Sequence, residues 1–186
     1  MVKLPGIDVD ADAPLHAATL RYFEPAGPFA AAVAAATGTP LPAPLTATIL
    51  PAVAADGAAV VLAWLRPTET LAFSEEAAPL AELKERLADA AGGHIVDLTG
   101  GLKAFGMHGT GAPELLSRLG GMATALGLNE ARRGRLADVP VLAVRVRAEK
   151  TLLIVDRVYA EHLRGWIEAT LADWTGCDMM GEADSE

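Results

Sequence analysis

The sequence predicts an α+β fold in which short antiparallel strands, paired as hairpins, alternate with amphipathic helices. Apolar runs rich in valine and leucine indicate strands, leucines at helical spacing indicate helices, and glycine pairs between apolar runs indicate tight turns. Tight turns join antiparallel strands, which excludes a purely parallel sheet. At 186 residues the chain is long enough to bury a core without disulfides or metals.

Prolines interrupt every apolar run of residues 1–57. Because proline fixes φ and removes a backbone donor, only short elements fit between them. We expect a Pro/Ala-rich segment packed on the body of the protein, with one alanine-rich helix over residues 29–37 between Pro28 and Gly38. The stretch at residues 39–44 is either a linker or a surface crossing, and typical connection lengths favour the crossing.

The body is expected over residues 58–175. An apolar run at 58–65 is typical of a buried strand, residues 70–73 would return as its hairpin partner, and the leucines from Leu80 to Leu87 predict a helix on the sheet.

The remaining elements repeat this order. Thr99-Gly100-Gly101 separates two apolar runs, which is a signal for a two-residue hairpin turn. The expected elements are strands at 94–98 and 102–107, a helix at 113–119, strands at 139–147 and 151–155, and a terminal helix with Leu163, Trp166, Ile167, Thr170, Leu171 and Trp174 on one face. Residues 176–186, which include the single cysteine Cys177, are expected to form an acidic flexible tail.

Composition excludes several classes of protein. A net charge of −9 argues against a nucleic-acid-binding protein, because neutralising phosphates supplies most non-specific affinity. No apolar stretch approaches the roughly 18 residues of a membrane span. The N-terminus has no apolar core of a signal peptide, and one cysteine makes no internal disulfide, so we expect a cytoplasmic protein.

Three ordered segments resemble the gamma subunit of heterotetrameric sarcosine oxidase, within the folate-binding aminomethyltransferase superfamily. The first is Trp64-Leu65-Arg66-Pro67 with Glu69, and the second joins Val96-Asp97-Leu98-Thr99 to the helix start at 109–116. The third is Asp156-Arg157 with Tyr159-Ala160-Glu161 and Trp166. The likeness covers about residues 62–171, and only the ordered set is specific.

The resemblance implies a folate-binding-domain-like fold and a non-catalytic subunit in the oxidative demethylation of sarcosine or another N-methyl amino acid. It implies larger partner subunits that hold FAD, FMN, NAD and tetrahydrofolate, with no cofactor in this chain. The region 131–141 contains Arg132-Arg133-Gly134-Arg135 and lacks the family's Asn-Asp-Gly-Gly type folate motif. Cys177 does not fill the Lys-Gly-Cys type motif of a related iron–sulfur branch.

Candidate sites in the sequence each have a structural alternative. Gly109-Thr110-Gly111 would open a helix and could cradle a phosphate, but Glu114 would repel it, so a tight turn with Thr110 as a cap is favoured. Asp97 and Asp156 could converge as an acid and base pair; turn binding by Asp97 and helix capping by Asp156 are favoured.

Histidines, arginines and tryptophans offer weaker candidates. His94, His108 and His162 are too far apart in sequence for a metal motif. The basic residues Arg132, Arg133, Arg135, Arg145, Arg147 and Lys150 are either the solvated face of a hairpin, which is favoured, or a patch for an acidic partner or anion. Trp166 and Trp174 are expected in the core, with an interface as the alternative.

We therefore assign no catalytic, cofactor-binding or metal-binding residue. The leading hypothesis is a structural gamma-type subunit of a sarcosine oxidase-like enzyme. The alternatives are a stand-alone folate-binding or one-carbon protein and, disfavoured by charge, a nucleic-acid-binding protein.

Overall fold

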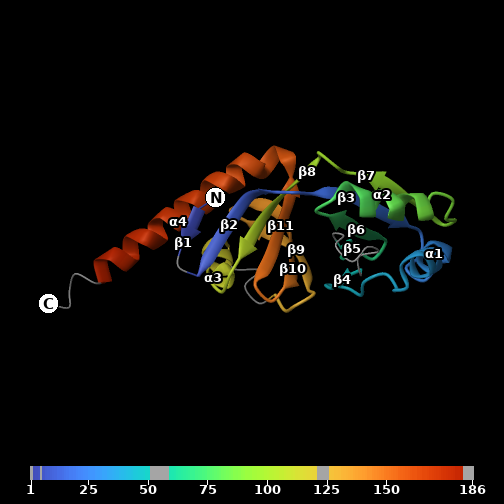
Figure 1. The fold of residues 1–186 in the computed structure, drawn as a ribbon, viewed down its shortest axis with the longest axis horizontal. Coiled ribbons are helices and arrows are strands. Elements are labelled where there is room, and N and C mark those ends of the chain that lie inside the picture. The colour runs from blue at the N-terminus through green and yellow to red at the C-terminus, as the bar shows by residue number, and fades with distance from the viewer. Residues whose placement is uncertain (1, 5, 51–58, 121–125, 182–186) are drawn as a thin grey trace.

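Two antiparallel sheets stand face to face in the computed structural model, which describes residues 2–4, 6–50, 59–120 and 126–181 (Figure 1). The six-stranded sheet has the order β1-β2-β8-β11-β10-β9 and the five-stranded sheet the order β4-β5-β6-β3-β7. All recorded pairings are antiparallel. The α+β class predicted from the sequence is therefore confirmed.

The six-stranded sheet takes its strands from both ends of the described chain. Its members are β1 (Val2–Leu4), β2 (Ile7–Ala13), β8 (Leu102–His108), β9 (Ala131–Leu136), β10 (Val139–Arg147) and β11 (Lys150–Asp156). Its outer face is covered by α3 (Ala112–Arg118) and by α4 (Ala160–Gly181), which follows the short 3-10 helix η1 (Arg157–Tyr159).

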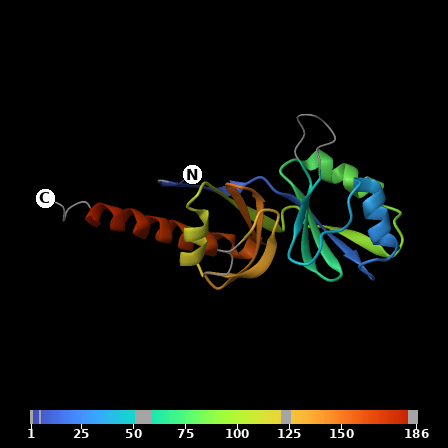
Figure 2. The same ribbon diagram turned by 90° about the horizontal axis from the view of Figure 1, so that it is seen from below.

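The five-stranded sheet comes from the intervening chain. Its members are β3 (His16–Tyr22), β4 (Ala47–Ile49), β5 (Val61–Arg66), β6 (Glu69–Ser74) and β7 (Gly93–Asp97). Helices α1 (Pro28–Thr37) and α2 (Ala77–Arg86) pack on its outer face. Figure 2 shows the resulting layers, with α1 and α2 at one end and α3 and α4 at the other.

Strand periodicity divides the buried side chains among three cores. Along β11, Leu153 and Val155 face the α3/α4 core, whereas Leu152 and Ile154 face the space between the sheets. Successive side chains of a strand point to opposite faces, so a strand buried on both sides is apolar throughout. The core between the sheets makes them one body rather than two separate domains.

The sheets also touch through their backbones at one edge. Ala47 N donates a hydrogen bond of 2.7 Å to the Asn129 carbonyl, and Ala131 N donates one of 3.0 Å to the Leu45 carbonyl. These bonds join the start of β4 to the start of β9, so the edge is closed by main-chain pairing.

Most elements expected after residue 58 are present, but one hairpin is not. The strands on either side of Gly100 and Gly101 belong to different sheets, because β7 pairs with β3 and β8 pairs with β2 and β11. The prediction of a hairpin here was wrong. The glycines do make a turn, with Gly101 N bonded to the Leu98 carbonyl at 2.9 Å, but the turn carries the chain across from one sheet to the other.

The N-terminal segment is also more regular than expected. Strands β2 and β3, of seven residues each, lie between Pro5 and Pro25, and β3 is an interior strand of its sheet. Neither strand was predicted from the sequence, and β9 was not predicted either. The helix expected at 29–37 is confirmed as α1, which ends at Gly38 with a φ of 73°.

The terminal helix is longer than expected. It continues to Gly181, inside the range expected to form the tail, and Figures 1 and 2 show its last turns extending beyond the sheet. The side chain of Cys177 and residues 182–186 lie outside the part that the structure describes.

Candidate functional site

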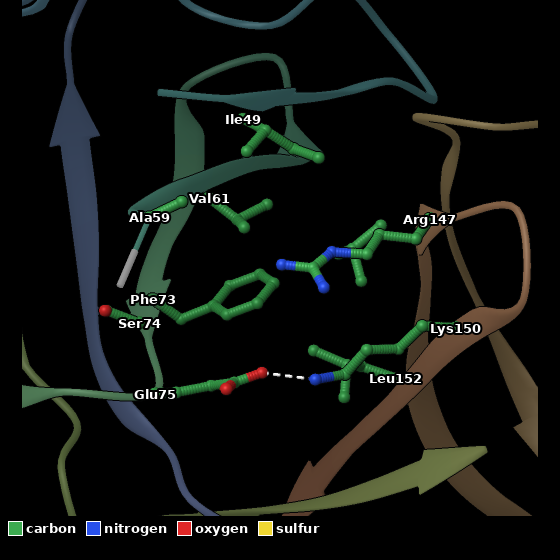
Figure 3. Close-up of a pocket in the computed structure, with 10 residues that line it drawn as sticks. Ile49, Ala59, Val61, Phe73, Ser74, Glu75, Arg147, Lys150 and Leu152 are labelled. Carbon is green, nitrogen blue, oxygen red and sulfur yellow. Dashed lines mark hydrogen bonds and ion pairs between the residues drawn. The ribbon is translucent and has the colours of Figure 1, made fainter. Parts of the chain in front are cut away.

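Two pockets open at opposite edges of the space between the sheets. The first, here called the hairpin pocket, has a volume of about 170 Å³ and lies beside the β10–β11 hairpin (Figure 3). Its apolar wall includes Val61, Phe73 and Leu152. Its polar lining is Ser74, Glu75, Arg147 and Lys150.

The hairpin pocket carries an uneven distribution of charge. Lys150, with 18% of its side chain exposed, forms an ion pair with Glu75 across the sheets. The side chain of Arg147 makes no hydrogen bond or ion pair with any described residue. In Figure 3 its guanidinium extends over the pocket toward the ring of Phe73.

A β-bulge explains why Arg147 lines this pocket. Arg145 pairs with Thr151, and Arg147 pairs with Lys150, so β10 carries one extra residue between the two pairs. A bulge re-aims the side chain that follows it. Arg145 consequently lines a different pocket and donates to the Leu126 carbonyl at 2.9 Å, whereas Arg147 turns to the inter-sheet side. The two arginines therefore line different pockets, although Arg147 is exposed to solvent as the favoured prediction expected.

The second pocket, here called the arginine cleft, has a volume of about 270 Å³. Arg21 and Arg66 both bind the carboxylate of Glu69, at 3.1 and 3.2 Å, and that side chain is only 16% exposed. Arg133 and Asp156 complete its charged lining. A bulge between Trp64 and Arg66 on β5 places Arg66 in this cleft. Two of the three cleft arginines, Arg21 and Arg66, already have a carboxylate partner in Glu69.

The glycines near α3 have a packing role. Gly111 N donates to the Gly6 carbonyl at 2.7 Å, and Gly109 N donates to the Glu149 carbonyl at 2.9 Å, so these donors are not directed at a ligand. A Cβ on Gly109 would lie 2.4 Å from the Gly6 carbonyl oxygen, and its φ is 106°. The tight turn favoured from the sequence is confirmed. The expected Thr110 cap is not, because Gly111 is the N-cap residue and no side chain caps the helix.

The two aspartates weighed as an acid and base pair lie in different surroundings. Asp97 accepts from Thr99 N at 2.8 Å, which confirms its turn role, and it also accepts from Lys84. The Lys84 hydrogen bond, followed by the Thr99 bonds, lowers the pKa of Asp97 from 3.8 to about 2. Asp156 occupies the N-cap position of η1, but its side chain makes no capping bond, so that expected bond is absent.

Histidines and acidic groups do not gather into a metal site in the described part of the chain, where no group of three or more potential ligands occurs. His162 lies 3.2 Å from the Ala137 carbonyl oxygen through Nε2, and His94 lines a pocket beside Lys84 and Asp97. Among the described residues, no helix is long and apolar enough to span a membrane.

The basic residues noted in the sequence are dispersed over several contacts. Arg132 pairs with Glu130 at 2.8 Å, and Arg135 donates to the Asp138 carbonyl. Among the described residues, Arg147 and Lys150 line one pocket together. The partners Phe73, Ser74 and Glu75 were missed, because they lie at the end of β6 and directly after it, far from the hairpin in sequence and without a motif of their own.

The two tryptophans of α4 lie on different faces. Trp174 packs against the core and stacks with Arg118, whose guanidinium carbon is 4.8 Å from the ring centroid. Trp166 is 52% exposed, and two nearby residues are exposed as well, Val158 at 82% and Tyr159 at 41%. The expectation of a core position was wrong for Trp166, which lies at the edge of the face that buries Leu163 and Ile167.

No protein-family model matches the chain. Curated relatives do: the sarcosine oxidase gamma subunit of Arthrobacter sp is 33% identical over 141 residues, covering 74% of this chain and 66% of the relative. The gamma subunit of Corynebacterium sp. (strain P-1) is 31% identical over 148 residues, covering 77% and 70%. The chain thus spans about two thirds of the length of these relatives.

Solved structures agree with the curated relatives. A chain of the heterotetrameric sarcosine oxidase from Corynebacterium sp. U-96 superposes with a TM-score of 0.72 and 26% identity, covering 90% of this chain and 84% of that chain. The glycine cleavage system aminomethyltransferase T from Bartonella henselae shares the fold, with a TM-score of 0.69, 13% identity, and coverage of 87% and 45%. The chain belongs to the sarcosine oxidase gamma subunit family.

Proposed function

We propose that the chain is the non-catalytic gamma subunit of a multi-subunit, sarcosine oxidase-like flavoenzyme that demethylates sarcosine or another N-methyl amino acid. The observation that carries the proposal is the agreement of two comparisons: the curated relatives are gamma subunits, and the solved relative comes from a heterotetramer. In this proposal the larger partner subunits hold FAD, FMN, NAD and tetrahydrofolate, and the complex works in the cytoplasm.

The contacts of the candidate residues support a structural role. The Gly109 and Gly111 amides and the Asp97 carboxylate are engaged in contacts within the fold. The surface also offers a place for a partner, because Val158 and Tyr159 of η1 and Trp166 of α4 leave aromatic and apolar side chains exposed. Aromatic side chains are enriched at the cores of protein interfaces. We expect this part of α4 to contact a larger subunit.

Co-expression tests the proposal. The tagged chain is produced alone and together with the flavin-bearing subunits from the same organism, and sarcosine oxidation is measured in both preparations. The expected result is a stable, active complex from co-expression and an inactive chain when it is produced alone. A monomer that ignores these subunits, or tight tetrahydrofolate binding by the isolated chain, would contradict it.

A further inference from the structure

The hairpin pocket combines an uncompensated cation with an apolar floor. The charged groups that line it are Arg147 from β10, Lys150 from β11 and Glu75, which directly follows β6. Glu75 neutralises Lys150, so one positive charge remains, on the exposed guanidinium of Arg147. The floor of the pocket is formed by buried apolar side chains, since Phe73 is 2% exposed and Leu152 is 5% exposed.

The pocket differs in this respect from the arginine cleft. There, Glu69 binds both Arg21 and Arg66, so the anionic partner is built into the protein. In the hairpin pocket the bulge in β10 directs Arg147 over Phe73, and no described carboxylate meets it. A guanidinium presents a planar fork of donors that matches a carboxylate in a bidentate arrangement.

We propose that the hairpin pocket binds a small carboxylate with a flat apolar group. The carboxylate lies on the Arg147 guanidinium, and the apolar group lies against Phe73, Val61 and Leu152. The volume of about 170 Å³ limits the ligand to a small molecule. This ligand site is independent of the proposed subunit function, and failure of one proposal would not contradict the other.

Benzoate and benzamide are the probes, because they have the same shape and differ in charge. The full 186-residue chain is titrated with each probe in a calorimeter. Benzoate is expected to bind and benzamide to bind much more weakly. Replacing Arg147→Gln is expected to weaken benzoate binding by about tenfold to a hundredfold, the range for hydrogen bonds to charged groups. Added salt should weaken the binding in the unmodified chain.

Arg133→Gln is the matched control, because it removes the same charge from the arginine cleft at the opposite edge. It should leave benzoate binding unchanged. Failure of benzoate to bind, equal binding of the two probes, or unchanged binding after Arg147→Gln would overturn the proposal.

A second readout does not depend on any variant. A crystal of the unmodified chain is soaked with 4-bromobenzoate, and the bromine is located by its anomalous signal. A bromine beside Phe73, with the carboxylate on Arg147, is the expected result. A bromine found elsewhere, or none, would overturn the assignment.

Discussion

Gly93 stands where β7 meets α1, with no room for a side chain. A Cβ at this position would lie 2.5 Å from Cγ of Phe29 and 2.6 Å from the Arg21 carbonyl oxygen. Phe29 is a fully buried core residue, so it has little freedom to withdraw. The close approach requires glycine here.

Replacing Gly93→Ala should therefore lower the free energy of unfolding by about 1–3 kcal/mol, the usual effect of overpacking a core. Gly165→Ala is the control, because no atom lies within 4 Å of a Cβ at that position of α4. It should stabilise the protein by up to about 1 kcal/mol through helix propensity. Urea unfolding of both variants measures the difference, and equal effects would contradict the packing argument.

Asp97 links α2 to the end of β7 through its carboxylate. Its pKa is lowered to about 2, first by the Lys84 hydrogen bond and then by the Thr99 bonds. A lowered pKa in the folded state means that the stabilisation is complete above pH 3.8, the ordinary value, and is lost as the pH falls toward 2.

Asp97→Asn should consequently lower stability at pH 7 by less than about 1 kcal/mol, because the pair is largely exposed. The variant should lose less stability than the parent between pH 4 and pH 2. Urea unfolding at several pH values checks this. A pH dependence identical in parent and variant would show that Asp97 does not contribute.

Helix α4 shows what sequence periodicity resolves at the scale of an element. The period places Leu163, Ile167 and Leu171 on the buried face, as the structure confirms. Trp166, three residues after Leu163, was assigned to that face by the same spacing, but it lies at the edge of the face and is 52% exposed. Helical spacing gives the direction of the buried face but not how far the sheet covers its edges.

Trp166→Ala and Trp174→Ala separate the two faces. Trp166→Ala should change the free energy of unfolding by less than about 0.5 kcal/mol, as surface substitutions do, and Trp174→Ala should lower it by about 1–3 kcal/mol. If α4 contacts a larger subunit, Trp166→Ala should also weaken the complex by about tenfold or more. Thermal unfolding and a pull-down measure these effects. A large loss of stability in Trp166→Ala would contradict the exposed position.

Strand partners were the least predictable elements. The apolar patterns of β7 and β8 identified both as strands, but the glycines between them suggested a hairpin. Which sheet takes each strand depends on burial against residues distant in sequence, such as β3 for β7 and β11 for β8. Local turn chemistry does not contain that information. Arg147 illustrates the same limit. The direction of its side chain depends on a β-bulge in β10, which the alternating pattern of apolar and basic residues in the sequence does not reveal.

At the scale of the whole molecule, the two sheets share one core. Leu152, which is 5% exposed, lies between the sheets with Phe73 and Val144. Leu152→Ala should lower the free energy of unfolding by about 2–5 kcal/mol. Because the core is shared, far-UV circular dichroism and tryptophan fluorescence should still report a single coincident transition. Two separate transitions would show that the sheets unfold independently.

The proposed function requires the chain to act as one subunit among several. The most direct test is affinity purification of the tagged chain from its native cells, with an absorption spectrum of the material that co-purifies. The expected result is a yellow complex that contains larger subunits and oxidises sarcosine or a related N-methyl amino acid. A colourless chain recovered alone would contradict it.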